Sequence, residues 1–181
     1  MKKSIVMRVT LFTVIASFAM TSFVSAQSSK NVKLIADSRN AKAAFIRSDA
    51  LMANLFNNSY AYVIFPNIGK GGIGVGGAAG NGIVFQNGNA IGSAKMKQVT
   101  VGFQFGGQTY REVIFFENSA ALDRFKQDNF EFSAQASAIA VTKGASGNVK
   151  YSNGVMIFTQ EKKGLMYEAS IGGQKFSFTP F

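Results

Sequence analysis

A glycine-rich block at residues 66–92 restricts the folds that this chain can adopt. It contains ten of the nineteen glycines, and the wider stretch of residues 50–111 contains no Asp or Glu. Gly72, Gly74 and Gly77 have the G-x-G-x-x-G spacing of dinucleotide-binding loops, but such a loop needs a helix directly after it and an acidic residue about 20 positions further on. The residues that follow are typical of a turn instead. We therefore expect no bound nucleotide, and a β-rich body in which the glycines permit tight turns and close strand packing.

The first 26 residues have the features of a secretory signal peptide. Lysine and arginine residues precede a mostly apolar stretch at residues 9–18, and Val24 and Ala26 lie where a signal peptidase requires small side chains. The apolar stretch is shorter than the ~20 residues that a membrane-spanning helix needs. We therefore expect cleavage before Gln27 and export to the periplasm or the extracellular space.

The mature chain is basic. Residues 27–181 hold 16 Lys and Arg against 9 Asp and Glu, which gives a formal charge of +7. At this length we expect a single domain with its own core. Such a charge favours anionic partners such as phospholipid head groups, whereas export and the lack of an aromatic and basic recognition motif argue against nucleic acid.

Two absent residue types exclude most catalytic chemistry. The chain has no His and no Cys, so serine–histidine and cysteine–histidine catalysis are excluded, and a zinc site would need carboxylates alone. Asp123, Asp128 and Glu131 lie close in sequence as carboxylate-pair catalysis would need, but Arg124 and Lys126 between them are more typical of a solvated helix end. We therefore expect that the protein is not an enzyme and that it binds no cofactor and no metal.

Residues 27–58 are predicted to form an amphipathic helix or a helix pair. Arg39, Lys42 and Arg47 lie opposite the apolar residues on a helical wheel, and the Ser and Asp at 48–49 are expected to cap the second helix of a pair, at about residues 50–57. A basic amphipathic helix either lies on an anionic membrane or packs its apolar side on its own domain, and the sequence leaves both open. The apolar side consists of Leu34, Ala41, Ala44, Phe45, Met52, Leu55 and Phe56.

Residues 59–181 are predicted to be rich in β-strands. Pro66 is expected to end the first strand, Asn87 and Gly88 are typical of a hairpin turn, and Asn118 or Ser119 can cap one short helix near residues 120–127. Long crossover helices are missing, which argues against a parallel sheet. The predicted strands cover residues 60–65, 83–85, 99–105, 110–116, 130–141, 149–151, 155–158, 165–171 and 175–178.

The expected fold class is therefore α+β. An N-terminal amphipathic helix or helix pair is followed by a glycine-rich antiparallel β-sheet or small barrel with one short inserted helix.

Several short motifs follow one another along the mature chain. They are residues 61–66 (AYVIFP), 69–77 (GKGGIGVGG), 80–84 (GNGIV), 102–106 (GFQFG), 112–116 (EVIFF), 121–125 (ALDRF) and 163–173 (KGLMYEASIGG). In this order they resemble the SYLF domain family, also described as a lipid-binding or actin-regulator family, over nearly all of residues 27–181. Members of the family commonly carry a Trp and a Pro where this chain has residues 93–97, so any role tied to that Trp does not carry over.

The resemblance implies a non-enzymatic module that binds lipid. Eukaryotic relatives bind phosphoinositides through a basic N-terminal region and engage actin, but an exported chain meets neither in its own cell. We therefore expect an anionic phospholipid or membrane surface as the partner, with peripheral membrane association, and we expect no actin, nucleic acid or nucleotide. The candidate lipid-binding residues are Lys30, Lys33, Arg39, Lys42 and Arg47 in the helical segment, and Lys70, Lys95 and Lys97 in the β-rich body.

Two other functions remain open from the sequence. One is a structural protein of the envelope without a ligand, in which the charge only serves solubility. The other is a small outer-membrane β-barrel, because the chain is β-rich and ends in Phe181. Strands of such a barrel should place apolar residues at every second position from that Phe, and Ser177 and Thr179 break this pattern.

Overall fold

The structure is a computed structural model, and it describes residues 29–73, 75–101, 106–127, 130–132, 138–163 and 173–181. The chain divides into two units, Met1–Lys33 and Leu34–Phe181, and the fold described here is that of the second. The predicted signal peptide and the strand predicted at residues 165–171 lie outside the described residues.

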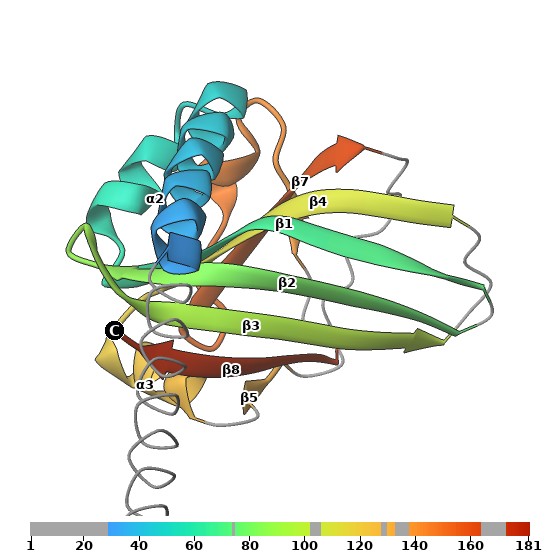
Figure 1. Ribbon diagram of the computed structural model, residues 1–181. Helices are drawn as coiled ribbons and strands as arrows, with labels where there is room; N and C mark the ends of the chain where they lie inside the picture. Colours follow the sequence, from blue (N-terminus) through green and yellow to red (C-terminus); the bar gives the residue numbers. More distant parts are fainter. Residues whose placement is uncertain (1–28, 74, 102–105, 128–129, 133–137, 164–172) are drawn as a thin grey trace, which may run out of the picture. The chain divides into compact units, whose positions relative to one another are not determined.

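Among the described residues, two α-helices precede the sheet and a third is inserted between its strands (Figure 1). Residues 29–48 are helical and are called the N-terminal helix. The elements that follow are α2 (Met52–Asn58), β1 (Ala61–Ile73), β2 (Val75–Gln86), β3 (Asn89–Val101), β4 (Gly106–Phe116), α3 (Ser119–Lys126), β5 (Phe130–Glu131), β6 (Ile139–Ala140), the 3-10 turn η1 (Ala145–Asn148), β7 (Val155–Lys163) and β8 (Gln174–Pro180).

The described strands form one curled sheet in the order β5-β8-β3-β2-β1-β4-β7-β6 (Figure 1). Its neighbouring strands pair antiparallel except at one edge, where β6 runs parallel to β7. The α+β class is confirmed, but the sheet is mixed, and the prediction of a purely antiparallel sheet is wrong at this edge. A parallel pair needs a connection of a dozen or more residues, and residues 141–154 supply it with a loop and η1 in place of a crossover helix.

Strand β1 alternates its side chains between two buried layers. Tyr62 and Ile64 pack against the N-terminal helix and α2, on what we call the helix face, while Val63 and Phe65 pack toward α3 on the opposite face, the α3 face. The register of β1 shifts at Pro66, and the strand continues beyond it. The prediction that Pro66 ends the strand is wrong, because a bulge accommodates a residue that has no N–H to donate.

Apart from Gly88, the described glycines of the block lie in long strands and not in turns. Residues 78–82, which the sequence predicted as a turn, belong to β2. Gly82 faces the bulge in β1, where an added Cβ would lie 2.7 Å from the carbonyl oxygen of Ile64. Glycine at this position therefore allows two strands to approach closely, which is the other role expected of the block.

Two local predictions are confirmed by the backbone. Asn87 and Gly88 turn between β2 and β3 with φ values of 50° and 78°, as a hairpin of this kind requires. Helix α3 begins after Asn118, whose Oδ1 accepts a hydrogen bond of 3.0 Å from the N–H of Ala121. The 3-10 turn η1 lies between the strands predicted at residues 130–141 and 149–151, and the second of these is not a strand in the structure.

The helical segment packs its apolar side on the helix face of the sheet. Phe45 and Met52 are fully buried, and Phe56 lies 4.9 Å from the ring centre of Phe115 and 5.1 Å from that of Tyr62. All seven apolar residues of the predicted stripe are buried or half-buried. Of the two arrangements that the sequence left open, the structure has the one in which the helix covers its own domain.

Candidate functional site

Basic residues of the N-terminal helix lie on its exposed side. Arg39 and Arg47 are exposed, whereas Ala41 and Phe45 of the same helix are buried on the sheet. Lys30 and Lys33 are also exposed, in the first described turns of the helix. The predicted opposition of basic and apolar sides is therefore confirmed for both arginines.

Lys42 differs from the other candidates in the helix. Its Nζ lies 4.9 Å from the ring centre of Phe56 and 5.3 Å from that of Tyr62, and it donates a hydrogen bond of 3.4 Å to the Tyr62 hydroxyl. Burial lowers the pKa of Lys42 below its ordinary value. This ammonium is held between two aromatic rings at the helix–sheet junction, so the structure does not place it with the exposed arginines.

Lys95 and Lys97 extend from β3 on the same face of the sheet as the helix. Their neighbours Ala94 and Met96 are buried on the α3 face, and side chains alternate along a strand. Lys97 pairs across the strands with Lys175 of β8, and partners in register project from the same face. Lys175 therefore joins Lys95 and Lys97, and it also contacts Glu131 at 3.5 Å.

Lys70 lies on the α3 face of the sheet, opposite to Lys95 and Lys97. It pairs in register with Ala78, which belongs to the core on the α3 face, whereas Lys97 pairs with the neighbouring Ala79. The structure therefore separates Lys70 from the other candidates of the β-rich body. We call the set on the helix side the basic face; it consists of Arg39, Arg47, Lys95, Lys97 and Lys175.

Arg111 was missed by the sequence analysis. It lies on the helix face of β4 beside Gln160 of β7 and donates a hydrogen bond of 2.7 Å to the Gln160 Oε1. Burial is the main cause that lowers the pKa of Arg111, and the positive charge of Arg47 lowers it further. Gln160 in turn donates to the hydroxyl of Ser48. The signal in the sequence was a charged pair, Arg111 and Glu112, directly before the apolar residues 113–116 of the same strand.

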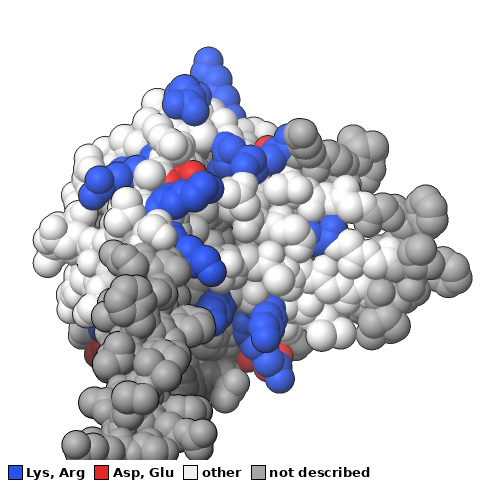
Figure 2. All heavy atoms as spheres, viewed as in Figure 1, with Lys and Arg blue, Asp and Glu red and all other residues white. Residues whose placement is uncertain are grey.

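The charges on this side of the molecule are mostly positive. Figure 2 shows Lys and Arg side chains spread over the N-terminal helix and over the sheet beside it, with few acidic side chains among them. The exposed Val99, 75% accessible, continues the row of Lys95 and Lys97 along β3. This side therefore exposes several cations together with the apolar side chain of Val99.

The α3 face buries a polar cluster. Glu112 of β4 is fully buried, and its Oε2 accepts a hydrogen bond of 3.1 Å from the Nε2 of Gln174. Among the described residues, its Oε1 has no hydrogen-bond partner, and neither has the Oγ1 of its cross-strand neighbour Thr159. Burial raises the pKa of Glu112 to about 7, although the bond from Gln174 acts in the opposite direction. Burial and the nearby Glu112 also raise the pKa of Tyr110.

Asp49 is a second buried acid, with a different role. Its Oδ2 accepts hydrogen bonds from the N–H of Ser146 at 2.8 Å and from the Ser146 hydroxyl at 2.6 Å, and its Oδ1 accepts one from Leu51 at 3.1 Å. Burial alone would raise the pKa of Asp49, but these hydrogen bonds and one from Gly144 hold it below the ordinary value. Asp49 was predicted to cap α2; in the structure it mainly fixes η1 to the helices.

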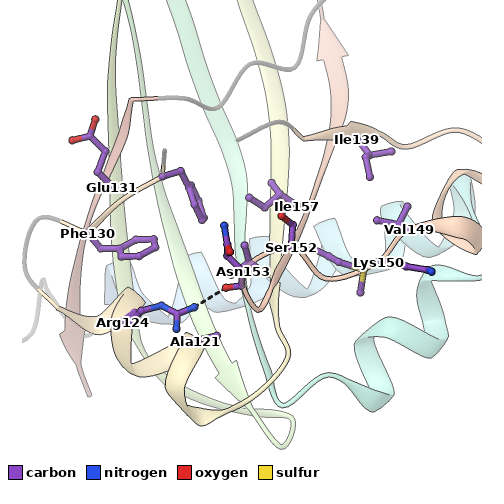
Figure 3. Close-up of a pocket in the computed structure, with 13 residues that line it drawn as sticks. Ala121, Arg124, Phe130, Glu131, Ile139, Val149, Lys150, Ser152, Asn153 and Ile157 are labelled. Carbon is purple, nitrogen blue, oxygen red and sulfur yellow. Dashed lines mark hydrogen bonds between the residues drawn. The ribbon is translucent and has the colours of Figure 1, made fainter. Parts of the chain in front are cut away.

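A cavity of about 590 Å³ opens between α3 and β7 (Figure 3). Arg124 lies on its rim and donates a hydrogen bond of 2.6 Å to the carbonyl oxygen of Asn153. Lys150 and Glu131 also line it. Its apolar lining residues are Ala121, Phe130, Phe132, Ile139, Val149, Val155, Met156 and Ile157.

No three acidic residues within the described ranges gather closely enough to hold a metal ion. No helix within the same ranges is long and apolar enough to cross a membrane.

Parts of this chain are similar to known proteins. Residues 97–179 match the family Ysc84, described as "Las17-binding protein actin regulator". A stretch of 71 residues is 34% identical to Beta cell expansion factor A of Aeromonas veronii, and it covers 39% of this chain but only 27% of that protein. Of the eight candidate residues, only Lys97 lies within the family match.

Proposed function

We propose, on the premise of the match between residues 97–179 and the Ysc84 (SYLF) family, that the mature protein is a non-enzymatic exported protein that binds anionic membrane surfaces. Binding is peripheral and uses the basic face. The signal-like sequence before Gln27 supports export, and the formal charge of +7 on the mature chain supports an anionic partner.

The observation that carries this proposal is that one side of the sheet collects several exposed cations. Arg39 and Arg47 project from the helix that covers the helix face, and Lys95 and Lys97 project from the same face of β3. A Lys or Arg near an anionic membrane contributes about 1 kcal/mol. Four such residues give roughly 4 kcal/mol, which by itself corresponds to a Kd of about 1 mM. Binding therefore needs several of these residues at once and is weakened by salt.

The apolar side of the helix contributes little to this binding. Phe45 and Met52 are fully buried on the sheet, so inserting them into a bilayer would first expose the helix face of the core. Losing the burial of a large apolar side chain costs about 1.5–3 kcal/mol for each residue. We therefore propose that the helix binds through its charges while it stays on the sheet.

The family description names an actin regulator, and an exported chain is separated from cytoplasmic actin. For that reason the proposal uses the lipid-binding role of the family and leaves actin aside. The rival function is a structural protein of the envelope without a ligand, in which the basic face serves only solubility.

Co-sedimentation with liposomes separates the two functions. The mature protein, residues 27–181, is mixed with vesicles of phosphatidylcholine alone or with added phosphatidylglycerol, at low and at high salt. We expect binding only to the anionic vesicles, and a marked loss of binding at high salt. Failure to bind anionic vesicles even at low salt would favour the structural protein.

A further inference from the structure

We propose that the cavity between α3 and β7 binds one single-chain amphiphile with an anionic head group, such as a fatty acid. This site adjoins the basic face at the contact between Glu131 and Lys175, but it would hold one molecule, whereas the basic face contacts a surface. Its volume of about 590 Å³ lies within the range of about 300–1,000 Å³ that is common for small-molecule sites.

The walls of the cavity fit an alkyl chain. Eight of its lining residues are apolar, and they include Phe130 of β5, the neighbouring Phe132, and Ile157 of β7. Phe130 lies 5.2 Å from Phe132 and 5.8 Å from Phe125, measured between ring centres, so the aromatic wall is continuous with the core of the α3 face. An alkyl chain in the cavity would lose contact with water without leaving a buried polar group unpaired.

The charges of the cavity fit an anionic head group. Arg124 and Lys150 line it, and both are exposed. Glu131, the acidic residue of the lining, is 3.5 Å from Lys175 and is neutralised by it. The cavity therefore has a net positive charge, and a cationic head group would be repelled.

Arg124 is already oriented for this role. Its Nη2 donates to the carbonyl oxygen of Asn153, which fixes the guanidinium at the rim (Figure 3). An arginine has five N–H donors in one plane, so this bond leaves others for a carboxylate or a phosphate. Bonds of that kind are charge-assisted and are about twice as strong as neutral ones.

Calorimetry on the mature protein tests the proposal. Laurate, below the concentration at which it forms micelles, should bind saturably at one molecule per chain. Dodecyltrimethylammonium has a chain of the same length and a cationic head group, and it should not bind. Lauroyl lysophosphatidylglycerol is titrated in parallel. Whichever of the two anionic amphiphiles binds more tightly shows whether the ligand is a free fatty acid or a lysophospholipid.

Variants locate the site. Lys150→Glu should weaken laurate binding by about tenfold or more, whereas Lys143→Glu, the same charge change at an exposed residue outside the cavity lining, should leave it within about twofold. The chain has no Trp, so Ser152→Trp introduces a single indole at the rim. Its emission should shift to the blue as laurate binds, with the same Kd as calorimetry gives.

The outcomes separate this site from the basic face. Lys150→Glu should bind anionic vesicles like the parent, and Lys95→Glu/Lys97→Glu should bind laurate like the parent. The proposal is overturned if neither anionic amphiphile binds. It is also overturned if both Lys variants bind laurate equally, if the indole emission stays unchanged on saturation, or if dodecyltrimethylammonium binds as tightly as laurate.

Discussion

Gln174 donates a hydrogen bond of 3.1 Å to Glu112, although three strands separate β8 from β4 in the sheet. In a flat sheet the two strands would lie roughly 19 Å apart, because neighbouring strands are about 4.8 Å apart. The contact therefore exists because the sheet curls around the α3 face. It also places a carboxyl group in an interior where burial disfavours its charge.

Replacing Glu112 should remove a pH dependence of stability. The pKa of Glu112 is raised from 4.5 to about 7 in the fold, so between these values the native state keeps a proton that the unfolded state releases. The free energy of unfolding therefore falls as the pH rises through this window and stays lower above it. Glu112→Gln resembles the protonated form and should be more stable than the parent at pH 8 by roughly 1–3 kcal/mol.

Urea denaturation of the parent and of Glu112→Gln at pH 5 and pH 8 measures this effect. The exposed Glu161 provides a matched control, since Glu161→Gln removes the same charge and should leave the pH dependence unchanged. An equal loss of stability between pH 5 and pH 8 in the parent and in Glu112→Gln would contradict this explanation.

Asp49→Asn should destabilise the protein at neutral pH. The pKa of Asp49 lies below its ordinary value of 3.8, so its stabilising contribution is present above that value and is lost as the pH falls through the folded pKa. Losing charge-assisted bonds to Ser146 should cost about 2 kcal/mol at pH 7, and the difference from the parent should shrink near pH 3. A double-mutant cycle with Ser146→Ala in chemical denaturation should give a coupling energy above ~0.5 kcal/mol, and additive effects would rule out the proposed pairing.

Gly82 should tolerate a methyl group poorly, and Gly69 should tolerate it well. An added Cβ at Gly82 would lie 2.7 Å from a backbone oxygen and 2.8 Å from the Phe65 ring, whereas Gly69 has nothing within 4 Å. Gly82→Ala should therefore lower the free energy of unfolding by about 1–3 kcal/mol, and Gly69→Ala should change it by less than ~0.5 kcal/mol. Thermal melts of the two variants check this pair, and similar melting temperatures would count against the close packing of β1 and β2.

The exported protein should begin at Gln27. Val24 and Ala26 have the small side chains that signal peptidase requires. The intact mass of protein recovered outside the cytoplasm measures the cleavage site. A mass that retains residues 1–26 would contradict export by this route.

The sequence predicted the features that depend on local patterns. The burial of Phe45 and Phe56 follows from helical periodicity, and the turn at Asn87 and Gly88 follows from backbone conformations that few residues adopt. The prediction at Pro66 was wrong. A proline usually ends a strand, but here the pairing of β1 with β2 and β4 continues through a bulge. A bulge depends on neighbouring strands that are distant in sequence.

The candidate site was predicted only in part, for the same reason. The exposed side of the N-terminal helix could be assigned from periodicity, but the separation of Lys70 from Lys97 depends on which face of the sheet each residue occupies. The face of each lysine is set by the strand register, in which Lys70 pairs with Ala78 and Lys97 pairs with Ala79. A shift of the register by one position would move a side chain to the other face. The curl that joins Gln174 to Glu112 left no local pattern in the sequence.

Charge reversal on the basic face tests the central claim most directly. The measurement is the fraction of the mature protein that co-sediments with phosphatidylglycerol-containing vesicles at low salt. Reversing Arg39, Arg47, Lys95 and Lys97 to Glu should remove at least roughly 4 kcal/mol, about a thousandfold in affinity, while the melting temperature stays close to that of the parent because these side chains are exposed. Lys97→Glu alone should weaken binding about fivefold, and Lys70→Glu, the same change on the opposite face, should have a smaller effect. If the fourfold variant is folded and still sediments like the parent, the basic face is not the membrane-binding surface.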